Sequence, residues 1–229
     1  IEAYDYASLP PPSFDSRTVA LSYSSRQIFS ALNLWSAIAE QACPISTIHI
    51  SDRGHPGMTR LRAAEQNAEA LGYVVENRVL GHCLFNSLPE VNGLEILAPA
   101  KVTGIDNQST ANAVLTVDVK NESRVISAKL IIAADGTDSF VRQSLGINQR
   151  HWDYHQSAII ANLALDTPHR NIAYERFTQS GPMALLPLVG YEADVNRYGL
   201  VWTVPQQNTE QVMQLDDQAF AAELEKRFG

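Results

Sequence analysis

The sequence predicts a mixed α/β protein in which a part built of helices and strands is interleaved with a part rich in antiparallel strands. Two observations support this fold class. The apolar run Leu130–Ala134 ends in Asp135-Gly136 and precedes a short helical segment, a pattern typical of a parallel strand buried on both faces. After Gly146 the pattern changes to short apolar segments separated by turns, which is typical of an antiparallel sheet.

The elements of the first part follow from periodicity and from turn residues. Apolar residues recur near helical spacing between positions 28 and 38, and the turn at Pro56-Gly57 divides an alternating stretch into a hairpin. A second helix is expected to begin near Asn77, and polar loops separate three strands. In order, we expect an extended segment and helix in 17–42, a hairpin in 46–61, a helix within 72–88, and strands around 95–105, 114–119 and 124–134.

The second part is predicted to be a sheet followed by a terminal helix. Asp216 or Asp217 is placed to cap an amphipathic helix that carries Phe220, Leu224 and Phe228. The predicted antiparallel strands are 155–165, 171–179, 183–189 and 197–205. The hairpin in 46–61 is expected to join this sheet, so that the two parts interleave along the chain.

Composition excludes several functional classes. Hydrophobic residues make up 45% of the 229 residues and charged residues 18%, as in ordinary globular proteins. The net charge of −8 argues against nucleic acid as a partner, because there is no basic excess to neutralise phosphates. No apolar run approaches the roughly 20 residues that a membrane-spanning helix needs. Cys43 and Cys83 lack metal-type spacing, so we expect two reduced thiols.

Asp135-Gly136 is the most informative candidate site. Nucleotide cofactors bind beyond the carboxyl ends of strands in open α/β sheets. A carboxylate at such a strand end can accept a hydrogen bond from a ribose hydroxyl, and a glycine lets the backbone approach a phosphate. The same residues are equally compatible with a tight turn between a strand and a helix that binds no ligand. From this motif alone both interpretations stay open.

Several longer segments carry a resemblance to a known family. They are FDSRTVALSYSSRQIFSALNLW (14–35), IHISDRGHPG (48–57), ALGYVVENRVLG (70–81), AADGTDS (133–139), YERFTQSGPMALLPL (174–188) and GLVWTV (199–204). Together they resemble FAD-dependent aromatic hydroxylases of the ubiquinone-biosynthesis group, most closely the 2-polyprenyl-6-methoxyphenol hydroxylases. The resemblance implies a partial FAD-binding, Rossmann-like domain at 1–45 and 76–150. It implies an antiparallel β-sheet substrate domain at 46–75 and 151–229.

The sequence departs from this family at two places. The family opens with a strand, a G-x-G-x-x-G turn and a helix that receives the FAD pyrophosphate, and it carries a later Gly-Asp motif that contacts the flavin. Neither motif occurs in this sequence. We therefore expect an internal fragment of a longer protein. Such a fragment is expected to bind FAD weakly or not at all and to lack hydroxylase activity.

The resemblance also implies cofactor-binding residues. Glu2 would bind the adenosine ribose, Arg17 would lie near the pyrophosphate, and Asp135 and Gly136 would face the cofactor. Further positions implied on the cofactor side are Arg26, Asn77 and Val102. For the two arginines a solvated surface role remains an alternative, and for Asn77 helix capping remains one.

The apolar GPMALLPL segment is interpreted as part of the wall of a pocket for a prenylated phenol. The neighbours assigned to this substrate pocket are Tyr174, Arg176, Pro187 and Trp202. The alternative is that the segment is an ordinary core strand. His151 and His155 are spaced by four residues in an expected loop, so no metal site is predicted.

The implied activity is that of an FAD-dependent monooxygenase that uses NAD(P)H as reductant and hydroxylates a prenylated phenol in ubiquinone biosynthesis. The sequence names no catalytic acid or base. Two alternatives stay open: a related flavin hydroxylase acting on another ring position or on a soluble phenol, and a nucleotide-binding or assembly module without catalysis. The expected location is cytoplasmic and peripheral to the inner membrane. The expected partners are other ubiquinone-biosynthesis proteins.

Overall fold

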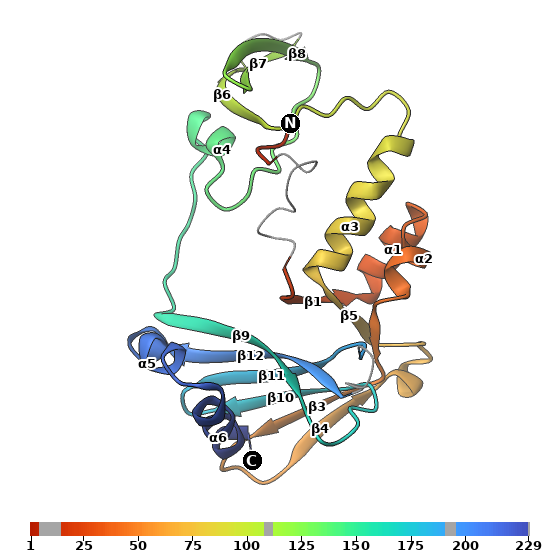
Figure 1. Ribbon diagram of the computed structural model, residues 1–229, viewed down its shortest axis with the longest axis vertical. Helices are drawn as coiled ribbons and strands as arrows, with labels where there is room; N and C mark the ends of the chain where they lie inside the picture. The colour runs from red at the N-terminus through yellow and green to blue at the C-terminus, as the bar shows by residue number, and fades with distance from the viewer. Residues whose placement is uncertain (5–14, 108–111, 191–195, 229) are drawn as a thin grey trace. The chain divides into compact units, whose positions relative to one another are not determined.

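The computed structural model describes residues 1–4, 15–107, 112–190 and 196–228. The chain forms two compact units, one made of residues 1–12 and 89–152 and the other of residues 13–88 and 153–229 (Figure 1). The helices are α1 Tyr23–Ala31, α2 Trp35–Ala39, α3 Asn77–Ser87, α4 Phe140–Ser144, α5 Thr209–Met213 and α6 Asp217–Phe228. The strands are β1 Thr18–Ser22, β2 Cys43–Ile45, β3 Thr47–Asp52, β4 Met58–Arg62, β5 Gly72–Glu76, β6 Ala100–Asp106, β7 Ala113–Val119, β8 Glu122–Ala128, β9 Gln156–Ala164, β10 Ile172–Thr178, β11 Gly181–Pro187 and β12 Arg197–Pro205.

The boundaries of these two units differ from those of the predicted domains. The units are defined by contacts within the structure, whereas the predicted domains are defined by the ligand that each is expected to bind, FAD or substrate. The units assign 13–45 and 76–88 to the same body as the large sheet. The prediction assigns those residues to the FAD-binding domain. The assignment of domains by ligand therefore stays a prediction.

The smaller unit contains a three-stranded antiparallel sheet in the order β6-β7-β8. Its core is formed by alternate residues of β7, which place Leu115, Val117 and Val119 on one face together with Ala100 of β6. Helix α4 follows, and Ser139 caps it by accepting a hydrogen bond from the Arg142 backbone N–H at 3.0 Å.

The predicted buried strand at 124–134 is wrong over its second half. Strand β8 ends at Ala128, and residues 129–134 are not in a strand. Leu130 and Ile132 are 76% and 82% exposed. A strand buried on both faces needs a neighbouring strand on each side for its backbone and a cover for each face. No described strand pairs with residues 129–134.

The larger unit contains a six-stranded sheet in the order β4-β3-β10-β11-β12-β9. All neighbouring strands are antiparallel except β3 and β10, which pair in parallel. The predicted hairpin is confirmed as β3 and β4. Its pairing with β10 joins it to the strands that follow residue 155, so the predicted interleaving of this sheet is confirmed as well.

Helices α5 and α6 pack on one face of the six-stranded sheet (Figure 1). The core beneath them includes Met183, Leu200 and Trp202, all fully buried, together with Val212 of α5 and Leu224 of α6. The strands supply this core because side chains alternate between the two faces of a sheet.

A second, three-stranded sheet in the order β1-β5-β2 carries helices α1 to α3. It joins the large sheet through an apolar cluster of Ile45, Val74, Ala173 and Leu188. At this junction an added Cβ on Gly199 of β12 would lie 2.6 Å from the Thr18 Oγ1 of β1. Only glycine therefore allows β1 to approach β12 this closely.

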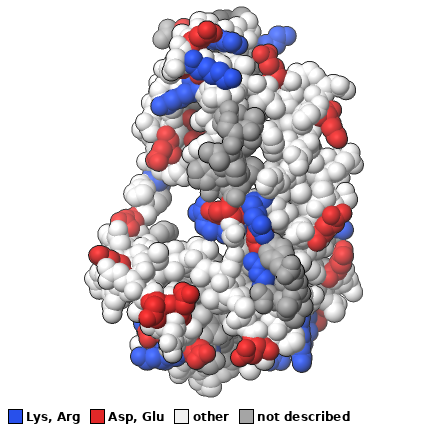
Figure 2. Space-filling model, in the orientation of Figure 1, with Lys and Arg blue, Asp and Glu red and all other residues white. Residues whose placement is uncertain are grey.

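Charged side chains of both signs are interspersed on the face of the molecule shown in Figure 2. Among the described residues, no helix has the length and apolar character required to cross a bilayer.

Candidate functional site

The predicted cofactor residues Arg17 and Asn77 are brought together by the junction between β5 and α3. The Asn77 N–H donates to the Arg17 carbonyl at 2.8 Å, and the Arg78 N–H donates to the Asp15 carbonyl at 3.0 Å. The Arg17 side chain is 56% exposed, and its Nε contacts the Asp15 carboxylate at 2.6 Å. An exposed ion pair of this kind is weak, so the Arg17 guanidinium remains accessible to a phosphate.

The same junction contains a buried carboxylate that sequence reasoning missed. Glu76, the last residue of β5, forms ion pairs with Arg78 of α3 and with Arg197 of β12, the latter at 2.9 Å. Arg197 also donates to the Val189 carbonyl at 3.1 Å. The sequence signal was an acidic residue at the end of the buried strand GYVVE, because a carboxylate there requires cationic partners.

Arg26 lies in a different environment from Arg17 and Asn77. Its guanidinium carbon is 5.9 Å from the ring centroid of Tyr23 and 5.8 Å from that of Trp35. One nitrogen contacts the Glu69 carboxylate at 3.4 Å. These partners explain its position by packing on α1 and α2, and a cofactor role for Arg26 stays a prediction.

Glu2 and Val102 lie in the smaller unit. The Glu2 N–H donates to the Leu97 carbonyl at 2.9 Å, and the Glu2 carbonyl accepts from the Ala100 N–H at 2.7 Å. These bonds align residues 2 and 97–100 in the way that strands pair. Val102 is half-buried in β6 opposite Val117, so its side chain belongs to the small sheet and its backbone is what a cofactor could approach.

Asp135 precedes helix α4 and accepts hydrogen bonds from residues at its N-terminal end. Its two carboxylate oxygens accept from the Ser139 hydroxyl at 2.6 Å and from the Val141 N–H at 3.2 Å. These hydrogen bonds, with that of Ser139 first, hold the pKa of Asp135 below its ordinary value. Asp135 is exposed and has no buried basic partner among the residues described.

Gly136 has a φ of +82°, and no atom lies within 4 Å of the position of an added Cβ. The backbone here is open to a ligand, and each oxygen of Asp135 retains capacity for a further donor. The geometry therefore fits a ribose or a phosphate. It also fits a tight turn that binds nothing, so the role of this pair stays a prediction.

The predicted substrate residues Tyr174 and Arg176 line a pocket of ≈ 520 Å³ beside the turn between β3 and β4. The Tyr174 ring lies 5.5 Å from that of His49 and 6.2 Å from that of Phe228, between ring centroids. The Arg176 Nη1 donates to the Ser51 hydroxyl at 3.2 Å. The register of β3 and β10 sets these contacts, because Tyr174 pairs with His49 and Arg176 with Ser51.

Pro187 and Trp202 lie on the same face of the sheet as Tyr174 and Arg176, but in its core. Both side chains are fully buried. The Trp202 ring packs at 5.6 Å from that of Phe220 on α6. Their observed contacts are those of a protein core, and their assignment to the substrate pocket stays a prediction.

The opposite face of the six-stranded sheet is apolar and partly exposed, a feature that sequence reasoning missed. One row of paired residues crosses five strands, and it runs Ile50, Glu175, Ala184, Val201, Ile160. Phe177, two residues after Glu175, is 47% exposed. The sequence signal was the presence of apolar residues at both odd and even positions of 158–163, which indicates a strand with two apolar faces.

We call this surface, formed by Ile50, Glu175, Phe177, Ala184, Val201 and Ile160, the uncovered face. Helices α5 and α6 cover the other side of the sheet, and α1 to α3 pack on the β1-β5-β2 sheet. None of the described helices packs over the row. Glu175 is the one carboxylate of this five-residue row, and Asp52, which pairs with Phe177, lies at the edge of the same face.

Comparison with known proteins places the chain in a family. The family model described as "FAD binding domain" matches residues 9–229. The ubiquinone hydroxylase UbiL of Rhodospirillum rubrum is 31% identical over 229 residues, which cover 100% of this chain and 51% of that protein. The mitochondrial ubiquinone biosynthesis monooxygenase COQ6 of Danio rerio is 28% identical over 95% of this chain and 45% of its own length.

A crystal structure of PqsL from Pseudomonas aeruginosa has the same fold, with a TM-score of 0.77 over 98% of this chain and 58% of that chain, at 15% identity. The chain spans about half the length of the curated relatives named above. The resemblance to flavin hydroxylases of ubiquinone biosynthesis and the FAD cofactor of the family are confirmed. The chain belongs to the family of FAD-binding domains.

Proposed function

We propose that the protein is an FAD-dependent monooxygenase that hydroxylates a prenylated phenol of ubiquinone biosynthesis. The names of two relatives, a ubiquinone hydroxylase and a ubiquinone biosynthesis monooxygenase, support this class of substrate. The structural observation that carries the proposal is the uncovered face, whose central row offers apolar side chains and the carboxylate of Glu175. A phenol with an apolar tail requires that combination, namely a large apolar contact and a single group that recognises the hydroxyl.

Each unit, taken by itself, offers residues that suit a part of FAD. In the larger unit, the exposed Arg17 guanidinium can pair with the pyrophosphate, and Asn77 stands beside it at the start of α3. In the smaller unit, Asp135 and Gly136 offer a carboxylate and an open backbone, and Glu2 offers a second carboxylate. When bound and reduced by NAD(P)H, FAD would activate O₂, of which one oxygen atom would enter the phenol ring and the other would leave as water.

The chain's own contribution is to hold the phenol and to control its proton. Ile50, Ala184, Val201 and Ile160 would bind the ring and the start of its tail and exclude water from them. Glu175 would accept the proton of the phenol hydroxyl, which makes the ring more electron-rich and more reactive towards an electrophilic oxygen. This assigns Glu175 as the acid–base residue that the sequence did not name.

Product analysis by mass spectrometry with the full-length protein tests the proposal. With FAD, NADPH and a prenylated phenol, we expect a product that has gained one oxygen atom. Glu175→Gln keeps the size of the side chain but removes the base, so kcat should fall about 100-fold with little change in KM. Glu225→Gln, at an exposed position of α6, is the matched control and should keep the activity of the parent protein.

An unchanged kcat in Glu175→Gln would remove the acid–base role. A full-length protein that purifies without flavin absorbance would instead favour a module without catalysis. Weak or absent FAD binding by this chain alone is a separate prediction, and a titration of FAD fluorescence checks it.

The proposed location is the cytoplasmic side of the inner membrane, with peripheral contact, because the substrate's tail is soluble in membranes. Partner proteins of the same pathway would present the substrate. Co-sedimentation of the full-length protein with vesicles that contain a prenylated phenol, compared with vesicles that lack it, tests this contact. Equal binding to both kinds of vesicle would contradict a substrate-directed association.

A further inference from the structure

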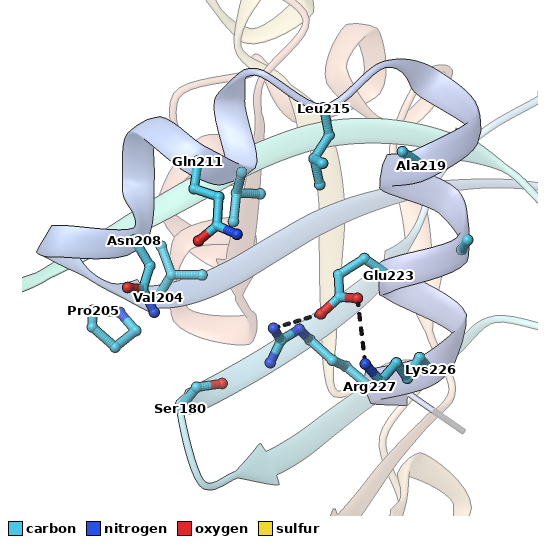
Figure 3. A pocket seen from close by; sticks show the side chains of 12 residues that line it. Ser180, Val204, Pro205, Asn208, Gln211, Leu215, Ala219, Glu223, Lys226 and Arg227 are labelled. Atoms are coloured by element: carbon cyan, nitrogen blue, oxygen red, sulfur yellow. Dashed lines mark ion pairs between the residues drawn. The ribbon is translucent and has the colours of Figure 1, made fainter.

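A second groove lies on the helix-covered side of the large sheet, opposite the uncovered face. It has a volume of ≈ 460 Å³ and lies between α5, α6 and the ends of β11 and β12 (Figure 3). One part of its wall is apolar, and it is formed by Val204, Val212, Leu215, Ala219 and Ala222. Its volume falls within the range of roughly 300–1,000 Å³ that is typical of small-molecule sites.

The other end of the groove is polar and basic. Ser180, Pro205 and Arg227 line it, and the same three residues line an adjoining pocket of ≈ 510 Å³. In that pocket Arg53 and Thr178 join them. In Figure 3 Leu215 lies at one end of the groove, and Ser180 and Arg227 lie at the other. The two pockets therefore form one continuous groove with an apolar end and a basic end.

Arg227 is held at the boundary between these ends. Its guanidinium carbon lies 5.2 Å from the ring centroid of Trp202, and its Nη2 contacts the Glu223 carboxylate at 2.6 Å. Its Nε is buried and has no hydrogen-bond partner among the described residues. An unsatisfied buried donor is costly, so this guanidinium has hydrogen-bonding capacity that the described residues do not use.

Among the described residues that line the groove, basic side chains outnumber carboxylates. Arg53, Lys226 and Arg227 are the cationic lining residues, and the one carboxylate is that of Glu223, which contacts Lys226 Nζ at 3.9 Å and Arg227. The backbone N–H of Arg53 donates to the Phe177 carbonyl at 2.9 Å, which fixes the turn that carries this exposed side chain. An anion would find two guanidinium groups and the Ser180 hydroxyl here, whereas the Thr178 hydroxyl donates to the Gly181 carbonyl at 2.7 Å.

We propose that this groove binds an amphiphile that has one apolar chain and a phosphate head group. The apolar wall would bury the chain, and Arg53 and Arg227 would pair with the phosphate, because guanidinium groups match its geometry. The site does not depend on the proposed hydroxylase activity. It lies on the opposite side of the sheet, and none of the residues of the uncovered face lines it.

Isothermal titration calorimetry with monododecyl phosphate, below its micelle concentration, tests the proposal. We expect saturable binding to the purified chain. Inorganic phosphate and dodecanol, titrated separately, each carry one half of the chemistry and should bind at least about tenfold more weakly. Binding of inorganic phosphate as tight as that of the amphiphile would reduce the groove to an anion site and overturn the proposal. Equally tight binding of dodecanol would overturn it as non-specific apolar adsorption.

Two matched pairs of variants locate the ligand. Arg53→Gln should weaken binding of monododecyl phosphate about tenfold, whereas Arg60→Gln, an exposed arginine of the same hairpin outside the groove, should leave it unchanged. Ala222→Phe should block the apolar end, whereas Ala221→Phe on the same helix should not. Thermal unfolding confirms that each variant is folded. The proposal is overturned if folded Arg53→Gln and Ala222→Phe bind as the parent chain does.

Discussion

Replacement of Glu76 by Gln tests whether the ion pairs at the start of α3 hold the larger unit together. The Glu76 side chain is 4% exposed, and that of Arg197, its partner at 2.9 Å, is 14% exposed. Arg78 is 41% exposed, so water can solvate that arginine after the substitution. Arg197 is less accessible to water, and its charge would lose the Glu76 carboxylate at 2.9 Å.

Breaking a buried ion pair by removing one partner costs about 3–5 kcal/mol. Because only one of the two arginines is well buried, we expect the lower end, about 3 kcal/mol, in the free energy of unfolding. Urea unfolding followed by far-UV circular dichroism measures this value. With a slope of about 2 kcal/mol per molar urea, the midpoint should fall by about 1.5 M.

Glu65→Gln is the matched control, because Glu65 contacts Arg62 at 2.8 Å with both side chains about half exposed. An exposed pair contributes less than about 1 kcal/mol. The reasoning is refuted if Glu76→Gln destabilises the chain no more than Glu65→Gln does. A double-mutant cycle with Arg197→Met would then show no coupling between the two positions.

Three further predictions follow from single observations. Because its pKa is lowered by the Ser139 and Val141 hydrogen bonds, Asp135 should stabilise α4 above its ordinary pKa of 3.8 and lose this contribution as the pH falls through the lowered value. Nuclear magnetic resonance titration of its carboxyl carbon, with Asp135→Asn as comparison, measures this, and a midpoint at or above 3.8 would contradict it. Burial raises the pKa of Cys43 to about 11, so iodoacetamide at pH 8 should label Cys83, which is less buried, before Cys43; mass spectrometry follows the labelling, and equal rates would count against the burial. Gly199→Ala should destabilise the chain by about 1–3 kcal/mol in thermal or urea unfolding, because the added Cβ would lie 2.6 Å from Thr18 Oγ1; Thr18→Ala should restore most of the loss, and failure to do so would show that the contact is not the cause.

Local patterns in the sequence were sufficient for most elements of the larger unit. The alternation and turn of 46–61 predicted the hairpin β3–β4, and the start of α3 at Asn77 was expected from the helical spacing of Leu80, Leu84 and Leu88. Each of these signals depends on neighbours within a few residues. Such signals survive in any tertiary context that gives the segment a solvent side and a core side.

Some assignments required the tertiary structure. The run Leu130–Ala134 has the composition of a buried strand, yet it is not a strand, because a strand is stabilised by partners that a local pattern does not contain. Likewise Tyr174 and Trp202 both belong to strands with apolar patterns, but one lines a pocket and the other lies in the core.

By itself the sequence determined the family, the mixed α/β class and the order of most helices and strands, because motifs and periodicity are properties of the chain alone. Only the tertiary structure decided which groups meet: Glu76 with Arg197, Tyr174 with His49, and Glu175 within an apolar row. The physical reason is that strand register and helix packing bring together residues more than 100 positions apart, and the free energy of such contacts depends on burial, which has no local signature.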